Sequence, residues 1–228
     1  MLQKGTGLIH DGYELCSPMF SREDLQQLIA DLEGSPLQRT RAGARHILGC
    51  EPVTRLAHDP RLLELASQWL GAAAIPFKAT LFDKRPDANW LVAWHQDTAL
   101  PICEHREAAG WSSWSEKSGV LYAHAPASVL ERVVALRVHL DDSTEINGPL
   151  RVLPGTHTSG VLSDAQVHEQ SLRVQPVTCT VAAGGVVVMR PLIIHASSKL
   201  NDQTPRRVLH LEYATSLDVE PGIKLRAA

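Results

Sequence analysis

His95, Gln96 and Asp97 form the local motif with the clearest chemical potential in this sequence. The residues before it, 91–94, predict a β-strand, and in a strand the side chains of residues i and i+2 point to the same face. His95 and Asp97 could therefore present an imidazole nitrogen and a carboxylate oxygen to one metal ion. An H-x-D triplet alone also occurs by chance in many proteins, so its meaning depends on the residues that accompany it.

His195 is the best candidate for a third metal ligand. It follows the apolar run 192–194, which predicts a strand that ends at His195 before a polar turn. Two histidines and one carboxylate on one face of a metal ion leave other positions open, an arrangement used by non-haem Fe(II) oxygenases. Neutral imidazoles and an anionic carboxylate suit Fe(II), and the open positions would accept a cosubstrate and O₂.

Arg206 lies beyond a predicted turn at residues 201–205. We expect the next strand to run back antiparallel and to bring this guanidinium near the metal. Arginine binds a carboxylate through two parallel hydrogen bonds, so a keto acid could chelate the metal at one end and meet Arg206 at the other. Because neighbours in a strand alternate, at most one of Arg206 and Arg207 can face the pocket. The alternative is that both are solvated at the start of the strand.

The sequence predicts helices first and short strands afterwards. Residues 21–33 form an amphipathic helix that Ser21 can cap, and Asp59-Pro60 opens a second helix that Gly71 ends. After Gly71, turns rich in Pro, Gly, Asn and Asp separate the strands, and no convincing ten-residue helical pattern lies between them. The predicted strands are 75–82, 91–94, 133–140, 150–153, 177–181, 186–189, 192–195 and 208–213.

This order favours a mainly β protein with flanking helices, a double-stranded β-helix of the jelly-roll, cupin-like type. We expect one domain over residues 1–228, with helices in about 1–72 and the barrel core in about 73–215. The connection 98–130 would be a long irregular insertion, typical of a lid, although its aromatic side chains could instead pack on the barrel. Within it, Trp111 and Trp114 are candidates to line a substrate pocket.

The composition limits the possible partners. The chain has 228 residues, 44% hydrophobic and 21% charged, with eleven histidines and a net charge of −3. The absence of a basic run argues against nucleic acid, and no apolar window predicts a membrane span or a signal peptide. The four cysteines form no C-x-x-C pair, which fits reduced thiols. We expect a cytoplasmic protein with a small-molecule substrate, and the sequence does not indicate an oligomeric state.

Three sequence features together resemble the phytanoyl-CoA dioxygenase family. They are the run that ends in His95-Gln96-Asp97, the segment 147–157, and His195 followed by Ser197 and Arg206. The resemblance extends over residues 11–213 and implies an Fe(II)- and 2-oxoglutarate-dependent oxygenase on a double-stranded β-helix. It also implies that the two histidines and Asp97 ligate iron, and that Arg206 and Ser197 bind the far carboxylate of 2-oxoglutarate.

Two more positions follow from the resemblance. Thr80 and Arg137 fall where the family contacts 2-oxoglutarate, although the phytanoyl enzyme has Trp at the position of Arg137. This second arginine could strengthen the carboxylate clamp or face the substrate. Asp97 argues against halogenating relatives, which lose the carboxylate. No basic cluster along the sequence indicates coenzyme A phosphates.

The reaction implied is oxidation of a small molecule by O₂, most simply its hydroxylation, with 2-oxoglutarate converted to succinate and CO₂. Desaturation is the other outcome that the same site would allow. The competing class is a non-catalytic cupin-like module that holds a metal and a small acid in the same barrel. Production of succinate would distinguish an enzyme from such a module.

Overall fold

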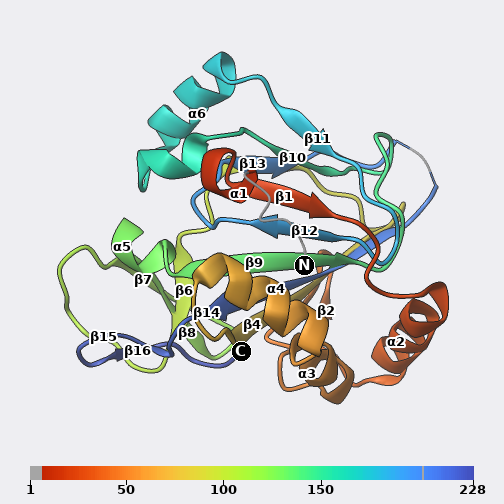
Figure 1. The fold of residues 1–228 in the computed structure, drawn as a ribbon, viewed down its shortest axis with the longest axis horizontal. Helices are drawn as coiled ribbons and strands as arrows, with labels where there is room; N and C mark the ends of the chain where they lie inside the picture. The colour runs from red at the N-terminus through yellow and green to blue at the C-terminus, as the bar shows by residue number, and fades with distance from the viewer. Residues whose placement is uncertain (1–6, 202) are drawn as a thin grey trace.

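The computed structural model describes residues 7–201 and 203–228, and its main feature is a pair of facing antiparallel sheets (Figure 1). The strands of these two sheets are β1 (Tyr13–Cys16), β2 (Arg39–Thr40), β3 (Gly43–Arg45), β4 (Ile75–Lys84), β5 (Val92–His95), β9 (Val133–His139), β10 (Leu150–Val152), β11 (Val177–Cys179), β12 (Val186–Met189), β13 (His195–Ser197) and β14 (Arg206–Ala214). The larger sheet has the order β1-β12-β9-β14-β4-β3-β2, and the smaller has the order β11-β10-β13-β5.

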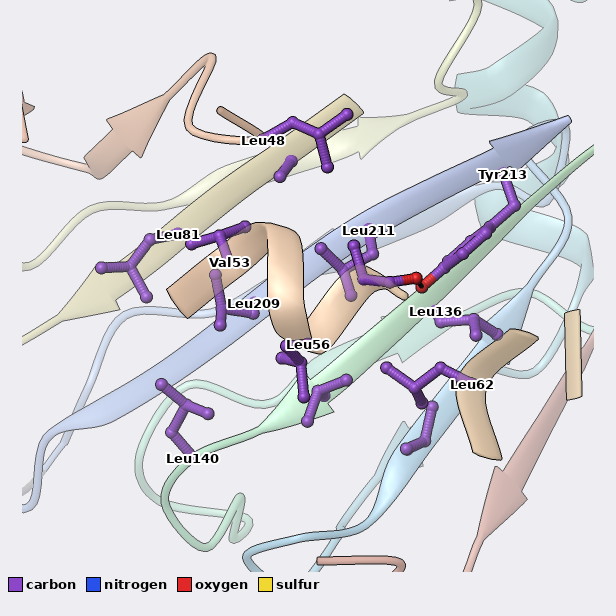
Figure 2. Packing of buried hydrophobic residues seen from close by; sticks show 14 of the residues in the cluster. Leu48, Val53, Leu56, Leu62, Leu81, Leu136, Leu140, Leu209, Leu211 and Tyr213 are labelled. Atoms are coloured by element: carbon purple, nitrogen blue, oxygen red, sulfur yellow. Dashed lines mark hydrogen bonds between the residues drawn. The ribbon is translucent and has the colours of Figure 1, made fainter. Parts of the chain in front are cut away.

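Helices cover the outer face of the larger sheet. They are α2 (Arg22–Gly34), α3 (Glu51–Ala57) and α4 (Pro60–Leu70). Leu56 and Leu62 from these helices pack with Leu209, Leu211 and Tyr213 of β14 in one apolar cluster (Figure 2). Burial of these apolar side chains stabilises the packing of the helices on the sheet.

The two predicted helices are confirmed by their caps. Ser21 forms a capping box with Asp24 at the start of α2. Asp59 caps α4, and Gly71 ends it in the left-handed conformation, with φ of 70°. The predicted N-terminal helical region starts outside the described residues, since residues 1–6 are not described. It also contains β1, β2 and β3, three strands that the sequence did not reveal because they are short or lack clear alternation.

The connection 98–130 is folded, which corrects the expectation of an irregular loop. It contains the three-stranded sheet β6-β8-β7 and the short helix α5. A separate apolar cluster joins this unit to the C-terminal hairpin of β15 and β16. The largely polar strand 112–117 carries no apolar alternation, so its sequence gave no strand signal. The bounds are β6 (Ala99–Ile102), β7 (Ser112–Lys117), β8 (Val120–His124), α5 (Ala127–Leu130), β15 (Asp218–Glu220) and β16 (Ile223–Lys224).

Two further expectations were wrong. The strand predicted at 192–195 begins rather than ends at His195. Residues 192–194 are apolar because they are buried in the core, and they lie outside the strand. A ten-residue helix, α6 (Asp164–Arg173), lies between β10 and β11 although no helical pattern was recognised there. Only Val167 of α6 is buried, so the usable signal was the capping box of Ser163.

Short helical segments complete the described chain. They are α1 (Gly7–His10) and the 3-10 helix η1 (Thr156–Ser159). None of the helices in the described part of the chain is long and apolar enough to cross a membrane.

Candidate metal and cosubstrate site

The three predicted metal ligands meet on the smaller sheet. His95 ends β5 and His195 begins β13, and these two residues are directly paired in register. Asp97 follows β5 and reaches both rings: its Oδ2 lies 3.4 Å from His195 Nε2, and its Oδ1 lies 3.6 Å from His95 Nε2. One candidate ligand atom from each residue lies within 4.8 Å of the other two. This spacing allows all three residues to bind one ion.

Backbone contacts orient both imidazoles. His95 Nδ1 lies 2.8 Å from the carbonyl oxygen of Ala93, and His195 Nδ1 lies 3.0 Å from that of Ile193. If each Nδ1 carries the proton and donates it to the carbonyl, each Nε2 keeps its lone pair for a metal. Burial alone would raise the pKa of Asp97, but the adjacent His195 and His95 hold it well below the ordinary value. Asp97 is therefore an anionic ligand at neutral pH.

Arg206 faces the triad from the opposite sheet. The expectation that its strand pairs with the strand of His195 was wrong, because β14 lies between β9 and β4 in the larger sheet. Arg206 is only 2% exposed, and it donates to Asn147 O at 3.3 Å and to Ser197 Oγ at 3.4 Å. Its Nη1 has no partner among the described residues. Arg207 points the other way and pairs with Asp141, as strand alternation requires.

Lys84 is a member of this site that the sequence analysis missed. Its buried ammonium donates to Ser197 Oγ at 2.9 Å and to the carbonyl of Ser198, and it lies 5.1 Å from the centre of the Trp90 ring. Burial, followed by the charges of Arg206 and Arg137, lowers the pKa of Lys84 to about 7. A lysine at a strand end usually suggests a solvated terminus. The available signal was alternation, because Lys78, Thr80, Phe82 and Lys84 share one face of β4.

A buried polar chain crosses the cavity-facing side of the larger sheet, from β9 through β14 to β4. Arg137 Nη1 lies 3.1 Å from His210 Nδ1, and His210 Nε2 lies 3.1 Å from Glu212 Oε1. Glu212 Oε1 also pairs with Lys78 Nζ at 2.7 Å. Burial lowers the pKa of His210, so a neutral ring can accept from Arg137 and donate to Glu212. The sequence left His210 as a core or surface histidine because its strand position alone did not reveal these partners.

One cavity of about 650 Å³ contains this arrangement. Besides the three metal-ligand candidates, its lining includes four residues predicted to bind the cosubstrate, namely Thr80, Arg137, Ser197 and Arg206. Trp111 and Trp114 do not line it. Trp111 donates to Glu220 of β15 at 2.7 Å and so joins the insertion to the C-terminal hairpin, whereas Trp114 packs against the ring of His105 within the insertion. Phe82 and Trp90 supply aromatic lining instead.

Comparison with known proteins gives the family. The sequence profile of the phytanoyl-CoA dioxygenase (PhyH) family matches residues 10–208. The chain belongs to this family. It is similar to L-proline trans-4-hydroxylase of Streptomyces griseoviridis, with 28% identity over 225 residues that cover 85% of this chain and 73% of that protein. It is also similar to the ectoine dioxygenase of Bordetella parapertussis, with 26% identity over 243 residues, covering 89% and 71% of the two chains.

Solved structures show the same fold. The crystal structure of EctD from S. alaskensis with 2-oxoglutarate and 5-hydroxyectoine has a TM-score of 0.71 and 20% identity, covering 96% of this chain and 77% of EctD. The epimerase SnoN in complex with Fe³⁺ and α-ketoglutarate has a TM-score of 0.69 and 19% identity, covering 97% and 84%. The expected double-stranded β-helix is confirmed. This PhyH-family chain is an Fe(II)- and 2-oxoglutarate-dependent dioxygenase.

Proposed function

We propose that this dioxygenase hydroxylates a small organic molecule at the cavity between the two sheets, with His95, Asp97 and His195 as the iron ligands. One observation carries this proposal: the buried Arg206 faces the triad across the cavity, and its Nη1 lacks a partner among the described residues. When bound, Fe(II) would supply the oxidising chemistry: together with 2-oxoglutarate and O₂ it would convert the substrate to a hydroxylated product, with release of succinate and CO₂.

The donor set fits Fe(II). Two neutral imidazoles and one carboxylate make a three-residue face, and the remaining side opens into the cavity. The carbonyls of Ala93 and Ile193 hold the rings, so their Nε2 atoms need little rearrangement to bind an ion.

The cation set fits the dianion 2-oxoglutarate. Arg206, Lys84 and Arg137 are buried, and none of them forms an ion pair with a carboxylate among the residues that the structure describes. Unpaired buried charges are costly, and a bound dianion would offset this cost. Arg206 and Ser197 would bind the far carboxylate, and Lys84 would hold the Ser197 hydroxyl in place.

Thr80 and Arg137 extend the cosubstrate site. Both line the cavity beside His210, which holds Arg137 through its Nδ1. The Nε of Arg137 has no partner within the described part of the chain. We assign Arg137 to the cosubstrate because it lies opposite His210 on β14, between the Arg206 end and Glu212, and because its charge acts on Arg206 as well as on Asp97.

The insertion 98–130 supplies part of the substrate wall through Thr98, Ala99, Lys117, Tyr122 and His124. A bound substrate would lie under this unit and would be shielded from solvent. The cytoplasmic location and the absence of a nucleic-acid partner stay predictions from the sequence.

Turnover tests this function. The Fe(II)-loaded protein is incubated with 2-oxoglutarate and ¹⁸O₂, alone and with L-proline, ectoine and other small cyclic or amino acids, and succinate and product mass are measured. We expect succinate in every reaction that contains O₂, increased by a substrate that gains one ¹⁸O atom. A folded, iron-bound protein that forms no succinate under any condition would instead support the non-catalytic module.

A further inference from the structure

Basic side chains from three separate segments meet at one end of the cavity. Arg45 of β3, Lys78 of β4 and Lys117 of β7 all line it. On β4, Lys78 is six residues from Lys84, and these two lysines lie opposite Glu212 and Arg206 of β14. Arg45 lies opposite Thr80, four residues from Lys84. At about 3.4 Å per residue, Lys78 is roughly 20 Å and Arg45 roughly 14 Å from Lys84 along the sheet. The cavity therefore has two cationic ends, and the proposed cosubstrate explains only one of them.

The charges at the second end are not balanced. Glu212 neutralises Lys78 through the 2.7 Å ion pair. Arg45 and Lys117 form no ion pair with any carboxylate of the described residues. The neighbouring His46 is affected by the same positive charges. Burial lowers its pKa, and the nearby cations Arg45, Lys78, Arg226 and Lys117 lower it further. Arg45 and Lys117 are both solvent-exposed residues that line the cavity, so a ligand can reach these two cations from solvent.

Tyr122 holds this cluster together. Its buried ring lies 5.7 Å from Lys78 Nζ and 5.1 Å from Lys117 Nζ, within the range of a cation–π contact. Its hydroxyl lies 2.8 Å from His46 Nε2. Lys117 is therefore positioned over a fixed aromatic surface. Residues 45, 78 and 117 are far apart along the chain and meet only in the fold, so no basic run in the sequence indicates this cluster.

We propose that the substrate is an organic acid whose carboxylate binds between Arg45 and Lys117. The inference rests on the proposed function and names its substrate class. A carboxylate held at this end would direct the rest of the molecule towards the metal triad, while 2-oxoglutarate occupies the end at Arg206. Arginine and lysine form strong charge-assisted hydrogen bonds with carboxylates, which makes an acid a better ligand than its neutral amide.

Matched acids and amides test this proposal. The anaerobic enzyme is saturated with Fe(II) and 2-oxoglutarate, and binding is measured by calorimetry for L-proline and L-prolinamide, butyrate and butyramide, and propyl phosphate at millimolar concentrations. We expect at least one acid to bind about tenfold or more tightly than its amide. Arg45→Gln and Lys117→Gln should each weaken acid binding about tenfold, and the double variant should weaken it further. Arg22→Gln, which removes an exposed cation outside the cavity, is the matched control and should have no effect.

Several results would overturn the proposal. They are equal binding of acid and amide, unchanged acid binding in the double variant, or no binding of any acid. Binding of propyl phosphate alone would replace the carboxylate with a phosphate ester. The visible band of the iron–2-oxoglutarate complex is recorded before each titration. Its presence without acid binding refutes only this inference, whereas its absence refutes the proposed function.

Discussion

The outward face of β14 carries Leu209, Leu211 and Tyr213, whereas its inward face carries Arg206, His210 and Glu212. The outward residues pack against helices in the apolar cluster of Figure 2. Most inward residues are charged or polar and line the cavity. Both faces are buried, so exposure to solvent does not distinguish them.

The difference lies in what each face needs in order to be stable. The outer face is satisfied within the protein, because every apolar side chain finds apolar neighbours. The inner face at Arg206 retains a nitrogen that has no partner among the described residues, and it holds cations that repel one another. A ligand that binds there would stabilise the folded protein by mass action. Substitutions on the two faces should therefore separate stability from function.

The largest effect is expected at the metal. Asp97→Ala removes the anionic ligand that both histidines share, so succinate production should fall by more than about 1,000-fold. The protein should remain folded, because Asp97 lies outside the apolar clusters. The measurement is the initial rate of succinate release together with the circular dichroism spectrum. Asp87→Ala, in an exposed loop, is the matched control, and an active Asp97→Ala enzyme would refute the ligand assignment.

The outer face should respond in the opposite way. Leu211→Ala creates a cavity between β14 and the helices and should lower the free energy of unfolding by about 2–5 kcal/mol. The affinity for 2-oxoglutarate should not change while the protein is folded, because this side chain points away from the cavity. Urea denaturation and 2-oxoglutarate titration measure the two quantities. A large loss of 2-oxoglutarate affinity in this variant would show that the two faces are not independent.

A substitution at Arg206 should reduce 2-oxoglutarate binding without reducing stability. Arg206→Gln removes the main carboxylate partner and should weaken 2-oxoglutarate binding about 10- to 100-fold. The free energy of unfolding without ligand should stay the same or rise, because the substitution removes a buried charge that forms no ion pair among the residues described here. Arg207→Gln is the neighbouring control and should leave the affinity unchanged. Equal effects of the two substitutions on 2-oxoglutarate binding would contradict the inward orientation of Arg206.

The smallest effect is a pH dependence at Lys84. Its pKa of about 7 in the unliganded protein means that the ammonium is charged below this pH and neutral above it. The dianion favours the charged form, so affinity for 2-oxoglutarate should be highest below about pH 7 and fall as pH rises. Lys84→Met should bind several-fold more weakly at low pH and show a flatter profile. A wild-type affinity that increases with pH between about 7 and 9 would contradict this role.

The sequence predicted the metal ligands and Arg206 better than the residues that lie around them. The metal triad was predictable because His95 and Asp97 are close in sequence and the H-x-D spacing has a direct geometric meaning in a strand. Arg206 was also chosen, but for a partly wrong reason, since it reaches the site from the opposite sheet. Pairing between distant strands is not encoded in any local pattern, so the sequence could not show which sheet holds β14.

The remaining features depended on contacts between distant segments. Lys84 contacts Ser197, more than a hundred residues away, and the Arg45–Lys117 end combines two strands, β3 and β7, that are far apart along the chain. Trp111 and Trp114 were chosen for their place in the insertion, but they line its own core or surface. The helix caps were predictable because Ser21 and Asp59 act on residues two or three positions away.

The most direct test of the central claim is an anaerobic titration of Fe(II) followed by 2-oxoglutarate, with the visible metal-to-ligand charge-transfer band as the signal. The site described here predicts a band in the wild-type protein, no band in His195→Ala, and a band in Arg206→Ala that needs far more 2-oxoglutarate. A folded wild-type protein that binds the metal but develops no band would contradict the claim.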